Sequence, residues 1–246
     1  MTEPLLQTEE LTRRFGALAA VDGVSLAFEA GKVHAVIGPN GAGKSTLLAM
    51  LSGEQRATAG RVRLRGADVT HFPPDRLSRL GVGRSYQTAN VFSELTCEEC
   101  MWLAAQSRAH TSMIFFSPAA RIAGAERALQ ACGLTARRST RAGELSYGEQ
   151  RQLEIGMVLA TEPSLLLLDE PLAGLGHDEA LRIVALLREV ARDRTLVLVE
   201  HDMDAVFSIA DTVTVLVGGR VLERGSPEQI RASAAVREAY LGEEQP

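Results

Sequence analysis

The stretch VHAVIGPNGAGKSTLLAML at residues 33–51 decides the fold class of this chain. Four of its first five residues are apolar, which is typical of a buried strand, and its last residues place several leucines on one face of a helix. Between them, Gly38, Gly43, Lys44 and Ser45 match the spacing G-x-x-x-x-G-K-[ST]. A strand, a glycine-rich loop and a helix in this order predict a loop that binds phosphate.

The residue types of this loop suit a nucleoside triphosphate. Glycines let successive backbone N–H groups turn inward around phosphate oxygens, and the helix N-terminus adds partial positive charge. We expect Lys44 to reach the β- and γ-phosphates of ATP, and the Ser45 hydroxyl to bind Mg²⁺. Only one other of the 26 basic residues is a lysine, Lys32. The predicted ATP contacts from this loop are Gly38, Asn40, Gly41, Gly43, Lys44, Ser45 and Thr46.

A second buried strand ends in two acidic residues. SLLLLD at 164–169 is followed directly by Glu170. Open parallel sheets bind ligands at the carboxyl ends of their strands. Asp169 is therefore expected to complete the Mg²⁺ site, while Glu170 polarises the attacking water as a general base. Without the phosphate loop, this pair would be interpreted as a helix cap or an ordinary surface pair.

A second candidate anion site is LSYGEQ at 145–150, about a hundred residues after the phosphate loop. The residues that follow have helical spacing, so Ser146 and Gly148 are predicted to lie at a helix N-terminus. One bound ATP needs only one such loop. The second loop is explained if it contacts the ATP of another chain, with two chains facing head to tail and two ATP molecules between them.

The rest of the sequence alternates strands and helices, which predicts a mostly parallel sheet. A capping box is predicted at residues 226–229. The other expected elements are short strands within 5–37, a strand at 60–69, helices across 94–160 with an irregular stretch at 111–118, a helix at 178–193, a strand at 195–199 and a hairpin of 212–217 with 220–223.

Composition excludes several classes of protein. The apolar fraction is 46% and the charged fraction 23%, as in ordinary globular domains. The longest apolar runs are far shorter than the ~20 residues of a membrane span, and MTEPLLQTEE lacks the features of a signal peptide. The net charge of −5, without a basic stripe, argues against nucleic acid as a ligand. We therefore expect a cytoplasmic protein.

The pair Cys97 and Cys100 forms a CxxC motif with two interpretations. It could be a metal or redox pair, or two small apolar residues one turn apart at the start of a helix. There is no second CxxC, and Cys132 is distant in sequence, so we favour the packing role.

The order of these motifs resembles the ATP-binding subunits of ABC transporters over essentially the whole chain. The matching segments are 38–45, Gln87, 145–150, 169–170 and His201. The resemblance implies an α/β P-loop NTPase fold of the ABC ATPase type. Residues 1–246 would form one ATP-binding domain: 1–87 and 161–246 a RecA-like core with an antiparallel β-subdomain, and 88–160 a helical subdomain that carries the signature motif.

The resemblance also implies roles for single residues. Phe15 matches the aromatic residue that stacks on adenine, and Val21 an apolar neighbour of it. Gln87 matches the glutamine near Mg²⁺ that also lies at the contact with the membrane subunit. His201 matches the switch histidine, and Glu170 the catalytic base. The signature residues that touch the opposing γ-phosphate correspond to Ser146 and Gly148.

Four residues depart from the family pattern, and none of them removes a group needed for hydrolysis. Tyr147 replaces the first signature glycine and Glu149 the usual glutamine. Gly176 stands at the position of the D-loop aspartate, and Glu99 where the subgroup usually has asparagine.

Longer stretches are similar to uptake systems for branched-chain amino acids and related polar compounds. These stretches are GRSYQTANVF, LSYGEQRQLEIGMVLA, VEHDMDAVF and REAYLGEE. The similarity implies an ATPase on the inner face of the cell membrane. Its partners would be integral membrane permease subunits, a second ATP-binding subunit, identical or different, and indirectly a periplasmic binding protein. The alternatives are the ATPase of a lipid or glycolipid exporter, and a soluble ABC ATPase of DNA repair, translation or iron–sulfur assembly.

Overall fold

The computed structural model describes residues 4–87, 90–107 and 118–241. Its strands are β1 (Leu6–Phe15), β2 (Leu18–Phe28), β3 (Val33–Ile37), β4 (Ala59–Leu64), β5 (Ala67–Asp68), β6 (Val82–Arg84), β7 (Leu165–Asp169), β8 (Thr195–Val199), β9 (Thr212–Val217) and β10 (Arg220–Gly225). Its helices are α1 (Lys44–Leu51), α2 (Pro74–Arg79), α3 (Cys97–Gln106), α4 (Pro118–Ala131), α5 (Tyr147–Ala160), α6 (His177–Val190), α7 (Met203–Ile209), α8 (Pro227–Ala232) and α9 (Ala234–Leu241).

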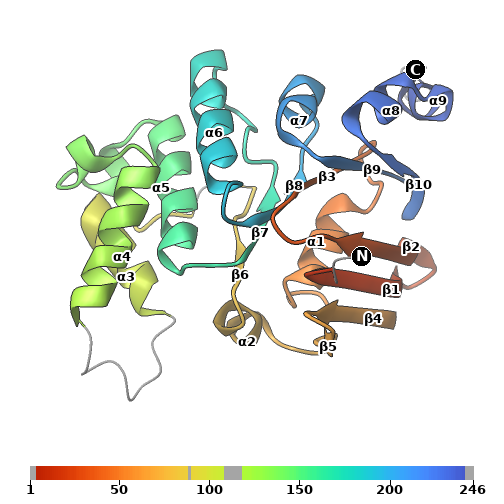
Figure 1. The fold of residues 1–246 in the computed structure, drawn as a ribbon, viewed down its shortest axis with the longest axis horizontal. Helices are drawn as coiled ribbons and strands as arrows, with labels where there is room; N and C mark the ends of the chain where they lie inside the picture. The colour runs from red at the N-terminus through yellow and green to blue at the C-terminus, as the bar shows by residue number, and fades with distance from the viewer. Residues whose placement is uncertain (1–3, 88–89, 108–117, 242–246) are drawn as a thin grey trace.

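The larger sheet has the strand order β10-β9-β3-β8-β7-β6 (Figure 1). All its pairs are parallel except β10 with β9, so the predicted mostly parallel sheet is confirmed. The carboxyl ends of parallel strands meet at one edge of a sheet. The segments that follow β3, β8, β7 and β6 therefore lie in a row, and these segments contain the phosphate loop, His201, Glu170 and Gln87 respectively.

Both faces of this sheet are covered, as the side chains of β7 show. Leu165 and Leu167 pack in one core with the leucines of α1, while Leu166 and Leu168 pack in another with α5 and α6. The period of two along a strand sends alternate side chains to opposite faces. The helix that follows the phosphate loop and the helix that follows the signature loop thus lie on opposite faces.

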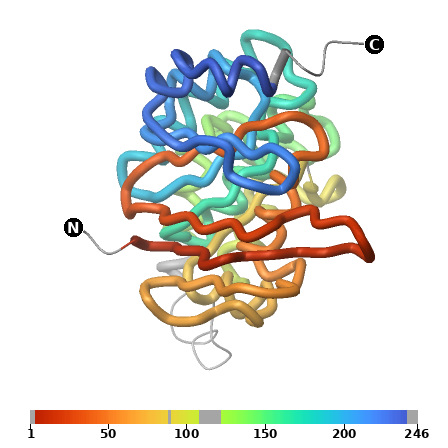
Figure 2. Tube along the Cα trace, turned by 90° about the vertical axis from the view of Figure 1, so that its right-hand side faces the viewer, coloured from red at the N-terminus to blue at the C-terminus, as the bar shows by residue number. Residues whose placement is uncertain are grey.

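The smaller sheet is antiparallel, with the order β2-β1-β4-β5, and it lies on the side of α1 (Figures 1 and 2). The strand predicted at 60–69 is split into β4 and β5 by a turn in which Arg65 has φ of 49°. This sheet is the antiparallel β-subdomain that the resemblance predicts. The strand β2 reaches the phosphate loop, because the carbonyl oxygen of Ala20 lies beside Gly43.

Helices dominate residues 94–160, as predicted, and α3, α4 and α5 pack together at one end of the molecule (Figure 1). The irregular stretch predicted at 111–118 lies outside the described residues except for Pro118, which begins α4. Cys97 and Cys100 are fully buried in this core, and burial raises the pKa of both thiols. This burial agrees with the packing role. The subdomain limits at 87/88 and 160/161 stay a prediction.

Two of the residues that depart from the family pattern, Glu99 and Glu149, take part in helix caps. Glu99 accepts a hydrogen bond from the Thr96 backbone N–H, and Glu149 does the same for Ser146. In return, each hydroxyl accepts from the glutamate's backbone N–H, which completes a capping box worth roughly 1 kcal/mol. The capping box predicted at residues 226–229 is confirmed.

The buried His34 in β3 leads us to expect pH-dependent stability. Its Nε2 lies 3.1 Å from the Glu29 carbonyl oxygen, and Nδ1 is buried without a hydrogen-bond partner among the described residues. Burial lowers the pKa of His34. Below about pH 6.5 the unfolded chain therefore binds a proton that the folded chain excludes. The free energy of unfolding consequently decreases as the pH is lowered.

Denaturant unfolding of the wild type and of His34→Leu at pH 7.5 and 5.5 measures this effect. We expect the wild type to lose roughly 1 kcal/mol more than the variant between the two pH values. An equal loss in both proteins would show that His34 does not contribute.

Candidate nucleotide-binding and hydrolysis site

The phosphate loop follows β3 and can be built only with glycine at two positions. Gly38 has φ of 146° and Gly43 of 98°, in the region that L side chains avoid. A Cβ atom would lie 2.0 Å from the Leu216 carbonyl oxygen at Gly38, and 2.1 Å from that of Ala20 at Gly43. The backbones of the neighbouring strands β9 and β2 thus lie so close to the loop that they exclude a side chain at either position.

Lys44 is folded back into this loop. Its Nζ donates hydrogen bonds to the carbonyl oxygens of Gly38 at 2.6 Å and Pro39 at 2.9 Å. The side chain is buried, whereas Asn40 and Gly41 are exposed. The loop therefore holds a cation beneath a mouth that is open to solvent, which fits the predicted contact with phosphate.

The predicted Mg²⁺ ligands Ser45 and Asp169 are brought together across 124 residues of sequence. The Ser45 hydroxyl donates to Asp169 Oδ1 at 3.2 Å. Burial raises the pKa of Asp169, and the Arg84 guanidinium, 3.7 Å from Oδ2, acts in the opposite direction. A hydroxyl and a carboxylate are hard oxygen ligands of the kind Mg²⁺ prefers, so this donor set fits the ion.

Gln87 and Glu170 also meet. Gln87 Nε2 donates to Glu170 Oε2 at 2.9 Å. Glu170 has φ of 45°, an unusual left-handed conformation for a residue other than glycine. This turn directs the half-buried carboxylate toward Gln87 at the carboxyl edge of the sheet, where a base for an attacking water is expected.

His201 is positioned by its buried neighbour Glu200. Glu200 Oε2 accepts from the His201 backbone N–H at 2.9 Å, and Oε1 accepts from the Leu172 N–H at 2.8 Å. The Glu200 carboxylate thereby joins the end of β8 to the segment after Glu170. The His201 ring itself is exposed, as a ligand-contacting side chain would be.

The two residues predicted near adenine differ in accessibility. Phe15 is 45% exposed, and the Arg13 guanidinium lies over its ring at 4.5 Å, so Phe15 can stack on a planar cation or base. Val21 is fully buried and packs under the loop next to Gly43. In this structure Val21 therefore supports the loop, and its role beside adenine stays a prediction.

The signature residues lie where α5 begins, as predicted. Ser146 is the N-cap, and its Oγ lies 3.5 Å from Glu179 Oε1 of α6. A Cβ at Gly148 would be 2.4 Å from the same carboxylate oxygen. Glu179 also accepts from the Gly176 N–H at 3.2 Å, so it caps the helix at the family's D-loop position. Tyr147 packs over Gly174 in that loop.

The geometry thus comprises a glycine-rich loop around Lys44, a carboxylate pair and a separate helix N-terminus at Ser146 on the opposite face of the sheet. A family model described as ABC transporter matches residues 21–173. This chain belongs to the ABC transporter family. A second model, branched-chain amino acid ATP-binding cassette transporter, matches residues 220–245.

Relatives of this ABC protein align over nearly its full length. It is 39% identical to the high-affinity branched-chain amino acid transport ATP-binding protein BraF of Pseudomonas aeruginosa, over 99% of this chain and 100% of the relative. It is 37% identical to the corresponding protein LivG of Escherichia coli K12, again over 99% of this chain and 100% of the relative.

Solved structures of ABC cassettes confirm the ABC ATPase fold. An ATP-binding cassette of an ABC transporter in its ADP conformation has a TM-score of 0.87 and 30% identity, over 98% of this chain and 100% of that one. A nucleotide-free cassette has a TM-score of 0.85 and 29% identity, over 96% and 98% of the two chains.

Four further residues of this ABC ATPase contribute to the site and were missed in the sequence: Arg84, Arg151, Glu154 and Glu200. Arg151 and Glu154 are three residues apart on α5 and both are buried. The available signal was an oppositely charged pair in phase with the apolar residues of a helix. Arg84 ends the short strand β6 and Glu200 follows the short strand β8, and neither position gives such a signal.

Among the described residues, none of the helices combines the length and the apolar character needed to cross a membrane.

Proposed function

We propose that this ABC ATPase powers the uptake of branched-chain amino acids or closely related polar compounds. The observation that carries this proposal is the agreement between the C-terminal family model and the full-length relatives BraF and LivG, which are named for that transport. The same agreement favours uptake over lipid export and over the soluble ATPases of repair, translation or iron–sulfur assembly.

Most of the residues proposed for hydrolysis lie at the carboxyl edge of the larger sheet, and Phe15 lies at the end of β1 in the smaller sheet. The loop amides and Lys44 bind the β- and γ-phosphates, and Phe15 stacks on adenine. Glu170 orients and deprotonates the attacking water, and its carboxylate is held by Gln87. Bound Mg²⁺, held by Ser45 and Asp169 with Gln87 nearby, would neutralise charge on the phosphates. His201 contacts the γ-phosphate from the end of β8.

The second ATP-binding subunit follows from the placement of the signature motif. Because α1 and α5 cover opposite faces of one sheet, Ser146 and Lys44 belong to separate sites within a chain. We infer that Ser146 and Gly148 contact the γ-phosphate bound by a second chain. Glu179 lies beside both residues, so its carboxylate must move aside when that phosphate arrives, since like charges repel.

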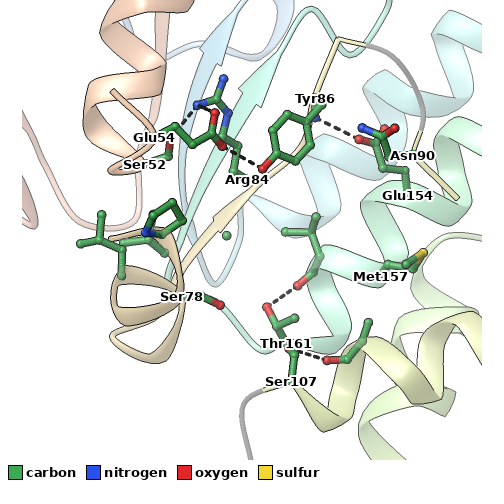
Figure 3. Close-up of a pocket in the computed structure, with 16 residues that line it drawn as sticks. Ser52, Glu54, Ser78, Arg84, Tyr86, Asn90, Ser107, Glu154, Met157 and Thr161 are labelled. Carbon is green, nitrogen blue, oxygen red and sulfur yellow. Dashed lines mark hydrogen bonds and ion pairs between the residues drawn. The ribbon is translucent and has the colours of Figure 1, made fainter. Parts of the chain in front are cut away.

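A groove next to Gln87 is our candidate contact for the membrane permease subunits. It encloses about 290 Å³ between α2 and β6 on one side and α3 and α5 on the other. Leu77, Ala104 and Met157 supply apolar surface. Figure 3 shows Arg84, Glu54 and Tyr86 pointing toward one another at one end of the groove, joined by an ion pair of 2.9 Å and a hydrogen bond of 2.8 Å.

This groove connects directly to the hydrolysis site. Arg84 pairs with Glu54 in the groove and also lies 3.7 Å from Asp169 Oδ2. A permease segment that enters the groove can therefore shift the guanidinium and change the charge next to a predicted Mg²⁺ ligand. In this arrangement the ATPase sits on the cytoplasmic face of the membrane, and a periplasmic binding protein delivers the transported molecule to the permease.

Reconstitution tests the function and the groove together. The tagged chain, isolated with its membrane subunits and placed in proteoliposomes with the binding protein, should import labelled leucine at the expense of ATP. Ala104→Arg fills the groove and should abolish uptake while the isolated chain hydrolyses ATP normally. Ala131→Arg, on an exposed site of α4, is the matched control. Absence of leucine, isoleucine and valine uptake in an assembled, ATP-hydrolysing complex would refute this substrate class.

A further inference from the structure

The side chain of Arg151 lies beneath the hydrolysis site, although it belongs to the helix that carries the signature motif. It is fully buried on α5, five residues after Ser146. Its five N–H groups meet five acceptors: the backbone carbonyls of residues 169–171, where β7 ends, the Tyr86 carbonyl and a carboxylate oxygen of Glu154. Every donor of the guanidinium is therefore used.

The three carbonyls belong to consecutive residues around the predicted base. Arg151 Nη2 donates to Asp169 O at 3.1 Å and to Glu170 O at 2.8 Å, and Nε donates to Pro171 O at 3.0 Å. Glu170 has the left-handed backbone conformation, which an L-residue keeps only when its surroundings hold it there. The planar guanidinium supplies that restraint, because it binds the carbonyl of Glu170 and those of the residues before and after it.

Glu154, the ion-pair partner of Arg151, restrains the backbone next to Gln87, at the other end of the Gln87–Glu170 hydrogen bond. Glu154 Oε2 accepts from Arg151 at 2.5 Å, and Oε1 accepts from the Tyr86 backbone N–H at 2.9 Å. Tyr86 immediately precedes Gln87, whose side chain binds Glu170. The buried pair thus holds the backbone on both sides of the Gln87–Glu170 contact.

The position of Arg151 on α5 joins the two ATP sites of a dimer. The N-cap of α5 is Ser146, which the proposed function places against the partner's nucleotide. The second turn of α5 binds the segment of Glu170, which in the same proposal serves the chain's own nucleotide. We propose that Arg151 is a positioning residue that holds Glu170 in its catalytic orientation and transmits movement of the signature helix to it. The proposal rests on the role of Glu170 given under the proposed function.

Arg151→Lys tests the proposal, because lysine keeps the charge but offers three donors from one point instead of a planar set. We expect a folded protein whose ATP Kd and KM change by less than about threefold, while kcat falls about 10²-fold, as for a misplaced catalytic group. Arg127→Lys, in an exposed ion pair with Glu162, is the control and should leave kcat unchanged.

A double-mutant cycle separates positioning from a general structural effect. In single-turnover assays, Arg151→Lys should have little further effect once Glu170→Gln is present, because the positioned group is already disabled. Effects that multiply would overturn the positioning role. If Arg151→Lys does not fold, the double variant Arg151→Gln/Glu154→Gln replaces the pair without an unpaired buried charge, and the same cycle applies.

The two proposals fail in different ways. If Glu170→Gln hydrolyses ATP at the wild-type rate, Glu170 is not the base, and both the site assignment and the role of Arg151 are wrong. If Glu170→Gln is impaired while folded Arg151→Lys keeps full kcat, only the positioning role is wrong.

Discussion

Lys44→Ala should lose ATP-dependent turnover, with kcat/KM at least ~10³-fold below that of the wild type. A single cation that stabilises a transferring phosphoryl group contributes on this scale. The Lys44 ammonium is already placed inside the phosphate loop by the carbonyls of Gly38 and Pro39. Removing it takes away the positive charge that the protein itself supplies inside the loop, so binding of ATP should weaken as well.

The composition of the chain provides the matched control for this variant. Lys32 is the only other lysine, and it is exposed in an ion pair with Glu29. Lys32→Ala should hydrolyse ATP like the wild type. Lys44→Arg should also fail, since a planar guanidinium cannot replace the ammonium between the two carbonyls. Rates measured by phosphate release, with ATP affinity by equilibrium binding, check all three; an active Lys44→Ala would disprove the site assignment.

Glu170→Gln should bind ATP normally but hydrolyse it at least ~10²-fold more slowly, the scale of general-base catalysis. Glutamine preserves the side-chain length, and its carbonyl oxygen can still accept from Gln87. The variant therefore keeps the geometry and loses only the basic group. Because ATP persists, the ATP-bound pair of chains should accumulate as well.

Glu162→Gln is an unusually close control for this change. Glu162 also has a left-handed backbone, with φ of 49°, but it lies in an exposed ion pair with Arg127. Light scattering of Glu170→Gln should show a dimer only with ATP and Mg²⁺, and Glu162→Gln should turn over normally. A persistent monomer with bound ATP would exclude a stable homodimer of the isolated chain and direct the search to a different ATP-binding subunit.

Local pattern was sufficient for the elements that carry the chemistry. The segments around β3, β7 and β8 are runs of apolar residues followed by glycine or charged residues, and β8 occupies residues 195–199 as predicted. In contrast, β6 has only three residues, too few to show any period, and its place at the sheet edge depends on pairing with β7. The helices α2 and α7 were missed because each has fewer than two full turns, which is too short for a helical period to be recognised.

The phosphate loop, the carboxylate pair, the signature loop and the alternation of strands and helices could be predicted from sequence, because each depends on neighbouring residues. The meetings between distant groups came from the packed structure. It brought Ser45 to Asp169, as expected for a shared Mg²⁺ site, placed Gln87 against Glu170 and Arg151 against the backbone carbonyls of residues 169–171, and showed that Val21 is buried. The reason is physical: strand order and the packing of helices on opposite faces of a sheet depend on contacts between residues far apart in the chain, which no local pattern contains.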